Sequence, residues 1–174
     1  MKKIKLMLLL AIFSFTLAAC TATPEDVKFY LNPGLDTIEV NSNYEDPGVT
    51  AKVFGIKRST EIVENTLDVS KIGSYHITYN FTYQDYDLTL VRIITVIDET
   101  PPVLVLNPGI DTVKIKQNWQ DASFSYYDNS EDEVSFEIEG FVDNSKAGTY
   151  VITYSAVDSS GNESKIYRYV NVIN

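Results

Sequence analysis

A block of nine residues occurs twice in this chain, and this repetition limits the possible folds more than any other feature. Residues 71–79 read Lys-Ile-Gly-Ser-Tyr-His-Ile-Thr-Tyr, and residues 146–154 read Lys-Ala-Gly-Thr-Tyr-Val-Ile-Thr-Tyr, an offset of 75 residues. In both copies Tyr, Ile and Tyr alternate with other residues, which is the period-2 pattern of a half-buried β-strand. Gly73 and Gly148 precede the alternating stretch, and glycine can form a turn with positive φ. Each copy is therefore expected to enter a strand from a tight corner.

The repetition extends over most of the chain. Residues 29–37 contain Asn-Pro-Gly and then a short alternating stretch, and residues 104–112 repeat this arrangement at the same offset. Asn-Pro-Gly favours a turn. Further along, Trp119 aligns with Tyr44, so we expect Trp119 to occupy a structural position in its copy.

A repeat of 75 residues is long enough to form a small domain by itself. Turn residues recur roughly every 8–12 residues and no helical periodicity follows residue 19, which is typical of about seven short strands packed as a β-sandwich. Residues 98–102, Asp-Glu-Thr-Pro-Pro, separate the copies, and their prolines favour a stiff, extended linker. The sequence therefore predicts an all-β chain of two tandem sandwiches, one over residues 28–98 and one over residues 99–174.

Residues 1–19 have the pattern of a cleaved signal peptide. Three lysines precede an apolar stretch, residues 6–17, which is shorter than the roughly 20 residues of a membrane-spanning helix. Residues 17–20, Leu-Ala-Ala-Cys, resemble the lipobox of bacterial lipoproteins. Cys20 is the only cysteine, and we expect it to begin the mature chain, to carry lipid such as palmitate, and to start a tether over residues 20–27. The alternative is an ordinary signal peptide in which this cysteine is incidental.

Charge restricts the partners of the mature chain. Removing the three lysines of the signal peptide changes the formal net charge from −10 to −13. Such an acidic chain is not expected to bind nucleic acid, or anionic headgroups through a basic patch. With its single cysteine lipidated, the folded part has no disulfide to stabilise it. The expected contact with the membrane is the lipid on Cys20, at the extracytoplasmic face of the cell membrane.

Several motifs resemble one known domain family: the linker 98–102, Tyr-Glu-Asp-Pro-Gly at 44–48, the block Lys-x-Gly-x-Tyr-x-Ile-Thr-Tyr in both copies, Asp-Ser-Ser-Gly-Asn at 158–162, and the final Tyr-Val-Asn-Val-Ile. They are similar to the Ig-like domain described from pesticidal crystal proteins, which occurs in tandem in bacterial surface proteins and is related in style to hyalin repeats. The first copy lacks Asp-x-x-Gly-Asn, and the second has Asp-Ala-Ser in place of Asp-Pro-Gly. The resemblance implies two Ig-like sandwiches with adhesive, spacer or accessory roles and no catalytic residues.

A tyrosine in each repeated block matches a structural position of Ig-type sandwiches. In those domains a tyrosine near the start of strand F, two residues before a core cysteine, bonds back to upstream backbone. Tyr75 and Tyr150 hold that place, and Ile77 and Ile152 stand where the cysteine would be. We expect a cysteine-free sandwich with a tyrosine corner in each domain.

Acidic loops are the candidates for a metal site. Asp128, Asp132, Asp158 and Asn162 lie in expected turns, and Asp98 and Glu99 precede the linker prolines. Carboxylate and amide oxygens from loops suit Ca²⁺, although the spacing does not match an EF-hand. The alternative is that these are solvated turn residues and that the protein takes no cofactor.

The sequence favours a protein that is not an enzyme. His76 is the only histidine and aligns with Val151, so the folded part has one imidazole for base chemistry and cannot build a histidine or thiolate zinc site. Paired carboxylates can hydrolyse glycosides, but sandwiches of this size offer little cleft for a substrate.

Two functions remain open from the sequence. The first is a lipid-anchored bacterial surface protein whose Ig-like domains serve as a non-enzymatic adhesion, interaction or spacer module. The alternative is a carbohydrate- or cell-wall-binding lipoprotein, because tyrosines on outward strand faces can stack on sugars. The candidates for such stacking are Tyr83, Tyr86, Tyr127, Tyr167 and Tyr169. The partner is accordingly expected to be a protein or a glycan.

Overall fold

The structure, a computed structural model, describes residues 21–174. The predicted signal peptide, residues 1–19, and the predicted lipidation site Cys20 lie outside the described residues. Within residues 21–174 the secondary structure consists of thirteen β-strands. No helix in this part of the chain could cross a membrane.

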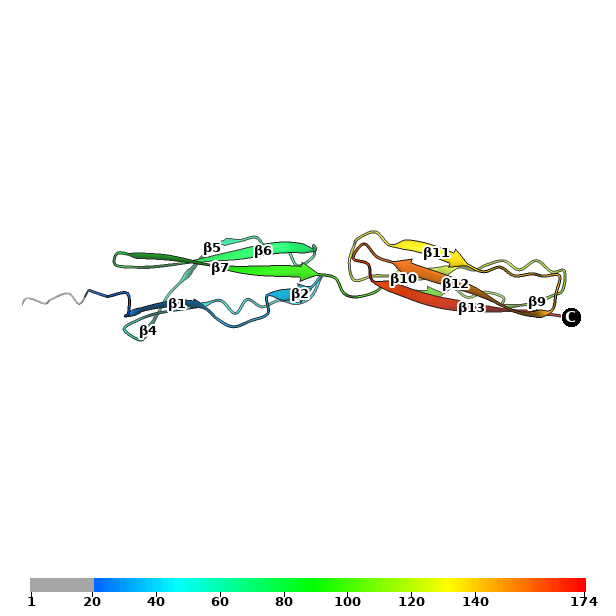
Figure 1. Cartoon of the computed structure of the whole chain (residues 1–174), viewed down its shortest axis with the longest axis horizontal. Helices are drawn as coiled ribbons and strands as arrows, with labels where there is room; N and C mark the ends of the chain where they lie inside the picture. Colours follow the sequence, from blue (N-terminus) through cyan, green and yellow to red (C-terminus); the bar gives the residue numbers. More distant parts are fainter. Residues whose placement is uncertain (1–20) are drawn as a thin grey trace, which may run out of the picture.

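Two β-sandwiches lie end to end, as Figure 1 shows, and residues 98–102 connect them. The prediction of an all-β chain with two tandem sandwiches is thus confirmed. The first domain has seven strands: β1 (Val27–Leu31), β2 (Thr37–Glu39), β3 (Val49–Val53), β4 (Ile56–Arg58), β5 (Glu61–Asn65), β6 (Gly73–Tyr83) and β7 (Tyr86–Ile97). The second has six: β8 (Val103–Leu106), β9 (Thr112–Lys114), β10 (Phe124–Tyr127), β11 (Ser135–Glu139), β12 (Gly148–Val157) and β13 (Glu163–Ile173).

Both domains use the same strand order. In the first, the sheets are β1-β3-β4 and β2-β7-β6-β5; in the second, they are β8-β10 and β9-β13-β12-β11. The edge strands β2 and β9 pair in parallel with β7 and β13, whereas the other strand pairs are antiparallel. The sequence repeat therefore encodes a repeat of topology.

The second domain has one strand fewer than expected. In the first domain a hairpin through Phe54 and Gly55, both with positive φ, turns β3 back into β4. Residues with positive φ at both central positions suit such tight hairpins. The second domain has Asp128 and Asn129 after β10, and this acidic segment makes no strand. The missing hairpin leaves a loop that lies at the junction between the domains.

The repeated block forms the central strands β6 and β12, and its alternation determines the core. Ile77 and Tyr79 are buried in the first domain, and Ile152 and Tyr154 are buried in the second. Buried residues of β2 and β7, and Phe29 from the facing sheet, pack against the first pair. This is the period-2 pattern that the sequence predicted, with apolar residues directed between the sheets.

The prediction that a glycine with positive φ forms the corner before each central strand is wrong. Gly73 and Gly148 begin β6 and β12, and neither has positive φ. A Cβ on Gly73 would lie 3.4 Å from the hydroxyl oxygen of Tyr75, which is an ordinary contact distance. The glycine thus lies beside the tyrosine ring in a regular strand, because the chain turns before it and not at it.

Candidate functional site

Three aspartates meet where the two domains join. Asp98 follows the last residue of β7, Asp128 follows β10, and Asp158 follows β12. One carboxylate oxygen from each lies within 4.8 Å of the corresponding oxygens of the other two. The cause is strand direction, since β7 runs toward the second domain whereas β10 and β12 run toward the first (Figure 1). We call Asp98, Asp128 and Asp158 the junction cluster.

The junction cluster is largely buried, and no Lys or Arg side chain of residues 21–174 forms an ion pair with it. The exposed fractions are 7% for Asp98 and 5% for Asp158, and Asp128 is half-buried. Among residues 21–174, every ion pair involves other carboxylates. Buried charges in proteins are normally paired with an opposite charge or bind a metal. The described residues therefore supply no opposite charge to offset the cost of burying these carboxylates.

Each loop satisfies part of its own carboxylate. The backbone N–H of Thr100 donates to Asp98 Oδ1 at 3.1 Å, and Ser130 donates to Asp128 Oδ1 from both its N–H and its hydroxyl at 2.9 Å. The second carboxylate oxygen of each of these two aspartates takes no part in these bonds. Oδ2 of Asp98 and Oδ2 of Asp128 are buried without a hydrogen-bond donor.

Asp158 and Asn162 close the third loop. Asn162 donates from its N–H to Asp158 Oδ1 at 2.8 Å and from its side-chain Nδ2 to Asp158 Oδ2 at 2.9 Å. The same Nδ2 donates to the backbone oxygen of Asp98 at 3.2 Å. Asn162 thus holds the hairpin against the linker.

Glu39 is a fourth carboxylate at the junction. It ends β2 and lies opposite Ile97 in the parallel pairing with β7, which places it beside the linker. Its side chain accepts hydrogen bonds from the Thr100 hydroxyl at 2.7 Å, the Glu99 N–H at 3.1 Å, and Asn129 Nδ2 at 3.0 Å. Glu39 therefore connects the first domain, the linker and the second domain.

The half-buried carboxyl of Glu39 and the buried carboxyl of Asp98 titrate differently. Burial, together with the nearby charge of Asp158, raises the pKa of Asp98. Burial also acts to raise the pKa of Glu39, but hydrogen bonds from Thr100, Asn129 and the backbone outweigh it, so the pKa of Glu39 is lowered. The Glu39 carboxylate thus receives several hydrogen bonds, whereas Asp98 keeps one oxygen, Oδ2, without a donor.

The sequence anticipated part of this site. Of the four predicted calcium ligands, Asp128 and Asp158 belong to the junction cluster and Asn162 bonds to it. Asp132 is exposed and lies outside the cluster. The sequence pointed to Asp98 through its position before the linker prolines. Nothing in the sequence pointed to Glu39, which reads as one polar residue of an alternating strand.

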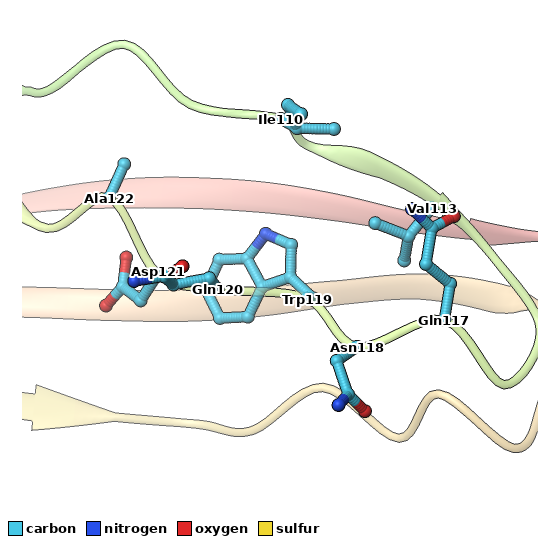
Figure 2. Close-up of a pocket in the computed structure, with 8 residues that line it drawn as sticks. All are labelled: Ile110, Val113, Gln117, Asn118, Trp119, Gln120, Asp121 and Ala122. Atoms are coloured by element: carbon cyan, nitrogen blue, oxygen red, sulfur yellow. The ribbon is translucent and has the colours of Figure 1, made fainter.

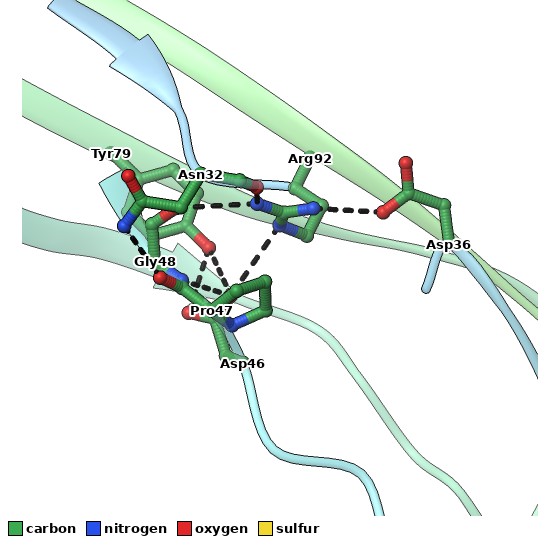
Figure 3. Close-up of polar contacts among 7 residues, drawn as sticks. All are labelled: Asn32, Asp36, Asp46, Pro47, Gly48, Tyr79 and Arg92. Carbon is green, nitrogen blue, oxygen red and sulfur yellow. Dashed lines mark hydrogen bonds and ion pairs between the residues drawn. The ribbon is translucent and has the colours of Figure 1, made fainter. Parts of the chain in front are cut away.

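A buried arginine network occurs in each domain and was not predicted. Figure 3 shows the first, in which Arg92 is 2% exposed. Its Nη1 donates to Asp36 Oδ1 at 2.8 Å, its Nη2 donates to the backbone oxygen of Asn32 at 2.6 Å, and its Nε lies 3.4 Å from Asp46 Oδ1. The Tyr79 hydroxyl donates to Asp46 at 2.7 Å. The network joins a core strand to the loops that flank β2.

The second domain repeats this network around Arg168. Its Nη1 donates to Asp111 Oδ1 at 2.9 Å, and its Nη2 donates to the backbone oxygens of Asn107 at 2.7 Å and Ser123 at 2.9 Å. Burial and the hydrogen bond to Asp121 raise the pKa of Tyr154 to about 12, as burial and Asp46 do for Tyr79. These phenols stay protonated and act as donors, so the networks are structural.

The tyrosines of the repeated block bond to upstream backbone. The Tyr75 hydroxyl donates to the Lys71 oxygen at 2.8 Å, and the Tyr150 hydroxyl donates to the Lys146 oxygen at 3.0 Å. This is the bond that the tyrosine-corner interpretation requires.

We expect Tyr75→Phe and Tyr150→Phe each to lower the free energy of unfolding by about 1 kcal/mol, the usual contribution of one such hydrogen bond. Urea unfolding of the two variants measures this, with Tyr30→Phe as the control because Tyr30 is an exposed tyrosine. Unchanged stability in both variants would show that the corner contributes nothing.

Trp119 lines a pocket of about 430 Å³ in the second domain (Figure 2). Its ring is half-buried, and its Nε1 is buried without an acceptor. The other lining residues are Ile110, Val113, Gln117, Asn118, Gln120, Asp121 and Ala122. Most of the lining comes from the loop between β9 and β10, which also supplies Asp121 to the arginine network.

His76 lies on the outer face of β6 and takes part in local contacts only. Its Nε2 is 3.0 Å from Glu64 Oε2, and its Nδ1 is 3.4 Å from Thr66 Oγ1. Both partners belong to the neighbouring edge of the sheet, so His76 joins β6 to that edge.

The tyrosines proposed for sugar stacking are not equivalent. Tyr167 and Tyr169 are 48% and 59% exposed, two residues apart on the outer face of β13. Tyr127 is also exposed but lies on the other sheet. Tyr83 and Tyr86 are half-buried, and Tyr86 donates to the Ala22 oxygen at 3.2 Å. Tyr83 and Tyr86 lie opposite each other in the β6–β7 pairing and pack against the core, so among the five candidates Tyr167 and Tyr169 are the exposed pair on one face.

Residues 110–172 match the family described as bacterial surface protein, Ig-like domain. The second domain is therefore similar to the Ig-like domains of bacterial surface proteins, and the match does not support the narrower pesticidal crystal protein type that the motifs resemble. A search of curated proteins found no match.

Two solved structures are similar to the chain. One is the lipoprotein BT2262 from Bacteroides thetaiotaomicron, at 15% identity and a TM-score of 0.37, covering 81% of this chain and 98% of that one. The other is the endo-fucoidan hydrolase MfFcnA4_H294Q from glycoside hydrolase family 107, at 16% identity and a TM-score of 0.28, covering 89% of this chain and 30% of that one.

Proposed function

We propose that this chain is a lipid-anchored bacterial surface protein, and that its tandem Ig-like domains form a non-enzymatic spacer or adhesion module at the extracytoplasmic face of the membrane. The bacterial surface Ig-like match of residues 110–172 supports the location. The observation that carries the proposal is the end-to-end arrangement of the domains, with the start of the described chain at one end and the C-terminus at the other (Figure 1).

An anchor before residue 21 would hold the second domain away from the membrane. The long strands β7 and β13 contain 12 and 11 residues. At about 3.3 Å per residue, each spans roughly 35–40 Å, so two domains in line reach on the order of 70 Å. A rod of this length suits a module that carries a binding surface beyond the membrane.

The anchor is tested by labelling cells that express the full chain with a palmitate analogue. We expect the wild-type chain to be labelled and to fractionate with membranes. Cys20→Ser is expected to be unlabelled and released, because no other cysteine exists to accept lipid. Ser14→Ala, a small change inside the apolar stretch, is the matched control and is expected to remain labelled. Labelling of the Cys20→Ser chain would refute the anchor.

Binding to a carbohydrate or cell-wall glycan is the second candidate function. The observation that favours it is the pair Tyr167 and Tyr169, because tyrosine rings two residues apart on a strand face the same side and can stack on successive sugars. The corresponding residues of the first domain are the exposed Val91 and Ile93. A glycan array probed with the full chain tests this function. Loss of a signal in a Tyr167→Ala and Tyr169→Ala double variant, but not in a Val91→Ala and Ile93→Ala variant, would support it.

A further inference from the structure

We propose that the junction cluster of Asp98, Asp128 and Asp158 binds one Ca²⁺ ion and that this ion couples the two domains. The three carboxylates come from the linker and from two loops of the second domain. An ion held by all three therefore ties the end of the first domain's last strand to the loop ends of the second domain.

The charge balance is the first argument. Asp98 and Asp158 are more than nine-tenths buried, and no Lys or Arg among residues 21–174 pairs with any of the three carboxylates. Carboxylates held this close repel one another and have lost most of their hydration. A divalent cation compensates both effects at once.

The unpartnered oxygens are the second and independent argument. Asp98 Oδ2, on a side chain only 7% exposed, has no donor, and neither has Asp128 Oδ2 or Asn129 Oδ1. With the carboxylates ionised, these atoms can only accept, so water or a cation is needed to satisfy them. Buried oxygens without donors, gathered beside three negative charges, are what a hard cation binds.

The spacing fits calcium. Oxygens bind Ca²⁺ at about 2.3–2.6 Å, so two ligands of one ion lie at most about 5 Å apart. The ligand atoms of the junction cluster all lie within 4.8 Å of one another. Mg²⁺ binds at about 2.0–2.1 Å, demands a near-ideal octahedron and usually keeps several of its waters. Loops that supply carboxylate and amide oxygens without such strict geometry favour the larger ion.

Within residues 21–174, a carboxylate cluster of this kind forms only where the two domains meet. In the first domain the residues that follow the strands corresponding to β10 and β12 are Phe54 and Gln84. At the far end of the second domain, Lys114 and Asn174 stand where the first domain has Glu39 and Asp98. The repeat itself therefore does not require these carboxylates, and their combination is specific to the junction.

Calcium alone, added to the full chain after treatment with EDTA, tests the proposal. Affinities of about 10⁻⁴–10⁻³ M are usual for extracellular calcium modules. At 10 mM CaCl₂ we then expect the melting temperature to rise by about 3–10 °C. Titration calorimetry is expected to give one ion per chain. Equal or larger effects of 10 mM MgCl₂ would overturn the assignment to calcium.

Asp98→Asn is the decisive variant, because asparagine keeps the acceptor for Thr100 and removes the buried charge. We expect it to lose the calcium shift and, in EDTA, to melt at or above the wild-type temperature. Asp132→Asn makes the same chemical change in an exposed neighbour and is expected to keep the full shift. If Asp98→Asn does not fold, Asp128→Asn provides the same test. No shift in the wild type, or an equal shift in Asp98→Asn, would overturn the site.

Discussion

Replacing Arg168 with alanine is expected to lower the free energy of unfolding of the second domain by about 3–5 kcal/mol, the usual result of removing one partner from a buried ion pair. The guanidinium is 2% exposed and bonds to Asp111 and to the backbone oxygens of Asn107 and Ser123. The alanine variant removes the guanidinium donors from these acceptors, of which the Ser123 oxygen keeps the Asn107 N–H. It also leaves Asp121 without its charge partner and opens a cavity among core strands. Each consequence acts in the same direction.

Urea unfolding measures this effect, and the tandem fold provides an internal comparison. Arg92→Ala is expected to destabilise the first domain by a similar amount, because Arg92 makes the same set of contacts. Arg168→Lys is expected to recover only part of the loss, since an ammonium cannot reach acceptors in several directions as a guanidinium does. Arg58→Ala, at an exposed arginine, is the control and should cost less than about 1 kcal/mol. A cost below about 1 kcal/mol for Arg168→Ala would contradict a structural role for the network.

Replacing Gly140 with alanine is expected to cost about 3 kcal/mol or more. Gly140 follows β11 with a φ of +97°, and a Cβ there would lie 2.3 Å from the backbone oxygen of Val151 on β12. A side chain with positive φ already costs roughly 1–2 kcal/mol. The overlap with Val151 adds to this, because a backbone oxygen within a central strand cannot rotate away and has to shift with its strand.

Gly161→Ala separates the two contributions. Gly161 also has a positive φ, +91°, but a Cβ there meets nothing within 4 Å. We expect this variant to show the backbone cost alone, about 1–2 kcal/mol. Urea unfolding of both variants, compared with the wild type, gives the cost of the overlap as the difference. Equal destabilisation by the two substitutions would mean that β11 and β12 are not held at the distance seen here.

Much of the fold follows from local sequence patterns. The alternation in residues 71–79 and 146–154 predicts strands with Tyr79 and Tyr154 inward, and both are fully buried. The period of 75 residues predicts two sandwiches, because a strand pattern repeated at that length can close its own core. The one strand that the sequence overcounted, a counterpart of β4, depended on a hairpin whose residues the second copy does not share.

The arginine networks and the contacts at the domain junction could not be predicted from such patterns. Arg92 and Arg168 lie on strands at positions that alternation assigns to the core, where an arginine is stable only if distant loops supply its acceptors. Those loops are about 45–60 residues away in sequence, as the bond between Arg168 and Asn107 illustrates at a separation of 61. The period-2 pattern predicts on which face of a strand a side chain lies, but it does not predict which loops contact that side chain.

The sequence by itself determined the strands, the repeat, the inward faces and the proline linker, because each depends on residues close together in the chain. Only the tertiary structure decided that Asp98, Asp128 and Asp158 share one site while the equally acidic Asp132 stays outside it. The physical reason is strand direction: β10 and β12 run the same way in the two sheets of the second domain, and both end at the face that receives β7, the last strand of the first domain. Carboxylates up to 60 residues apart in the sequence therefore meet where the domains join. The sequence repeat does not predict this meeting.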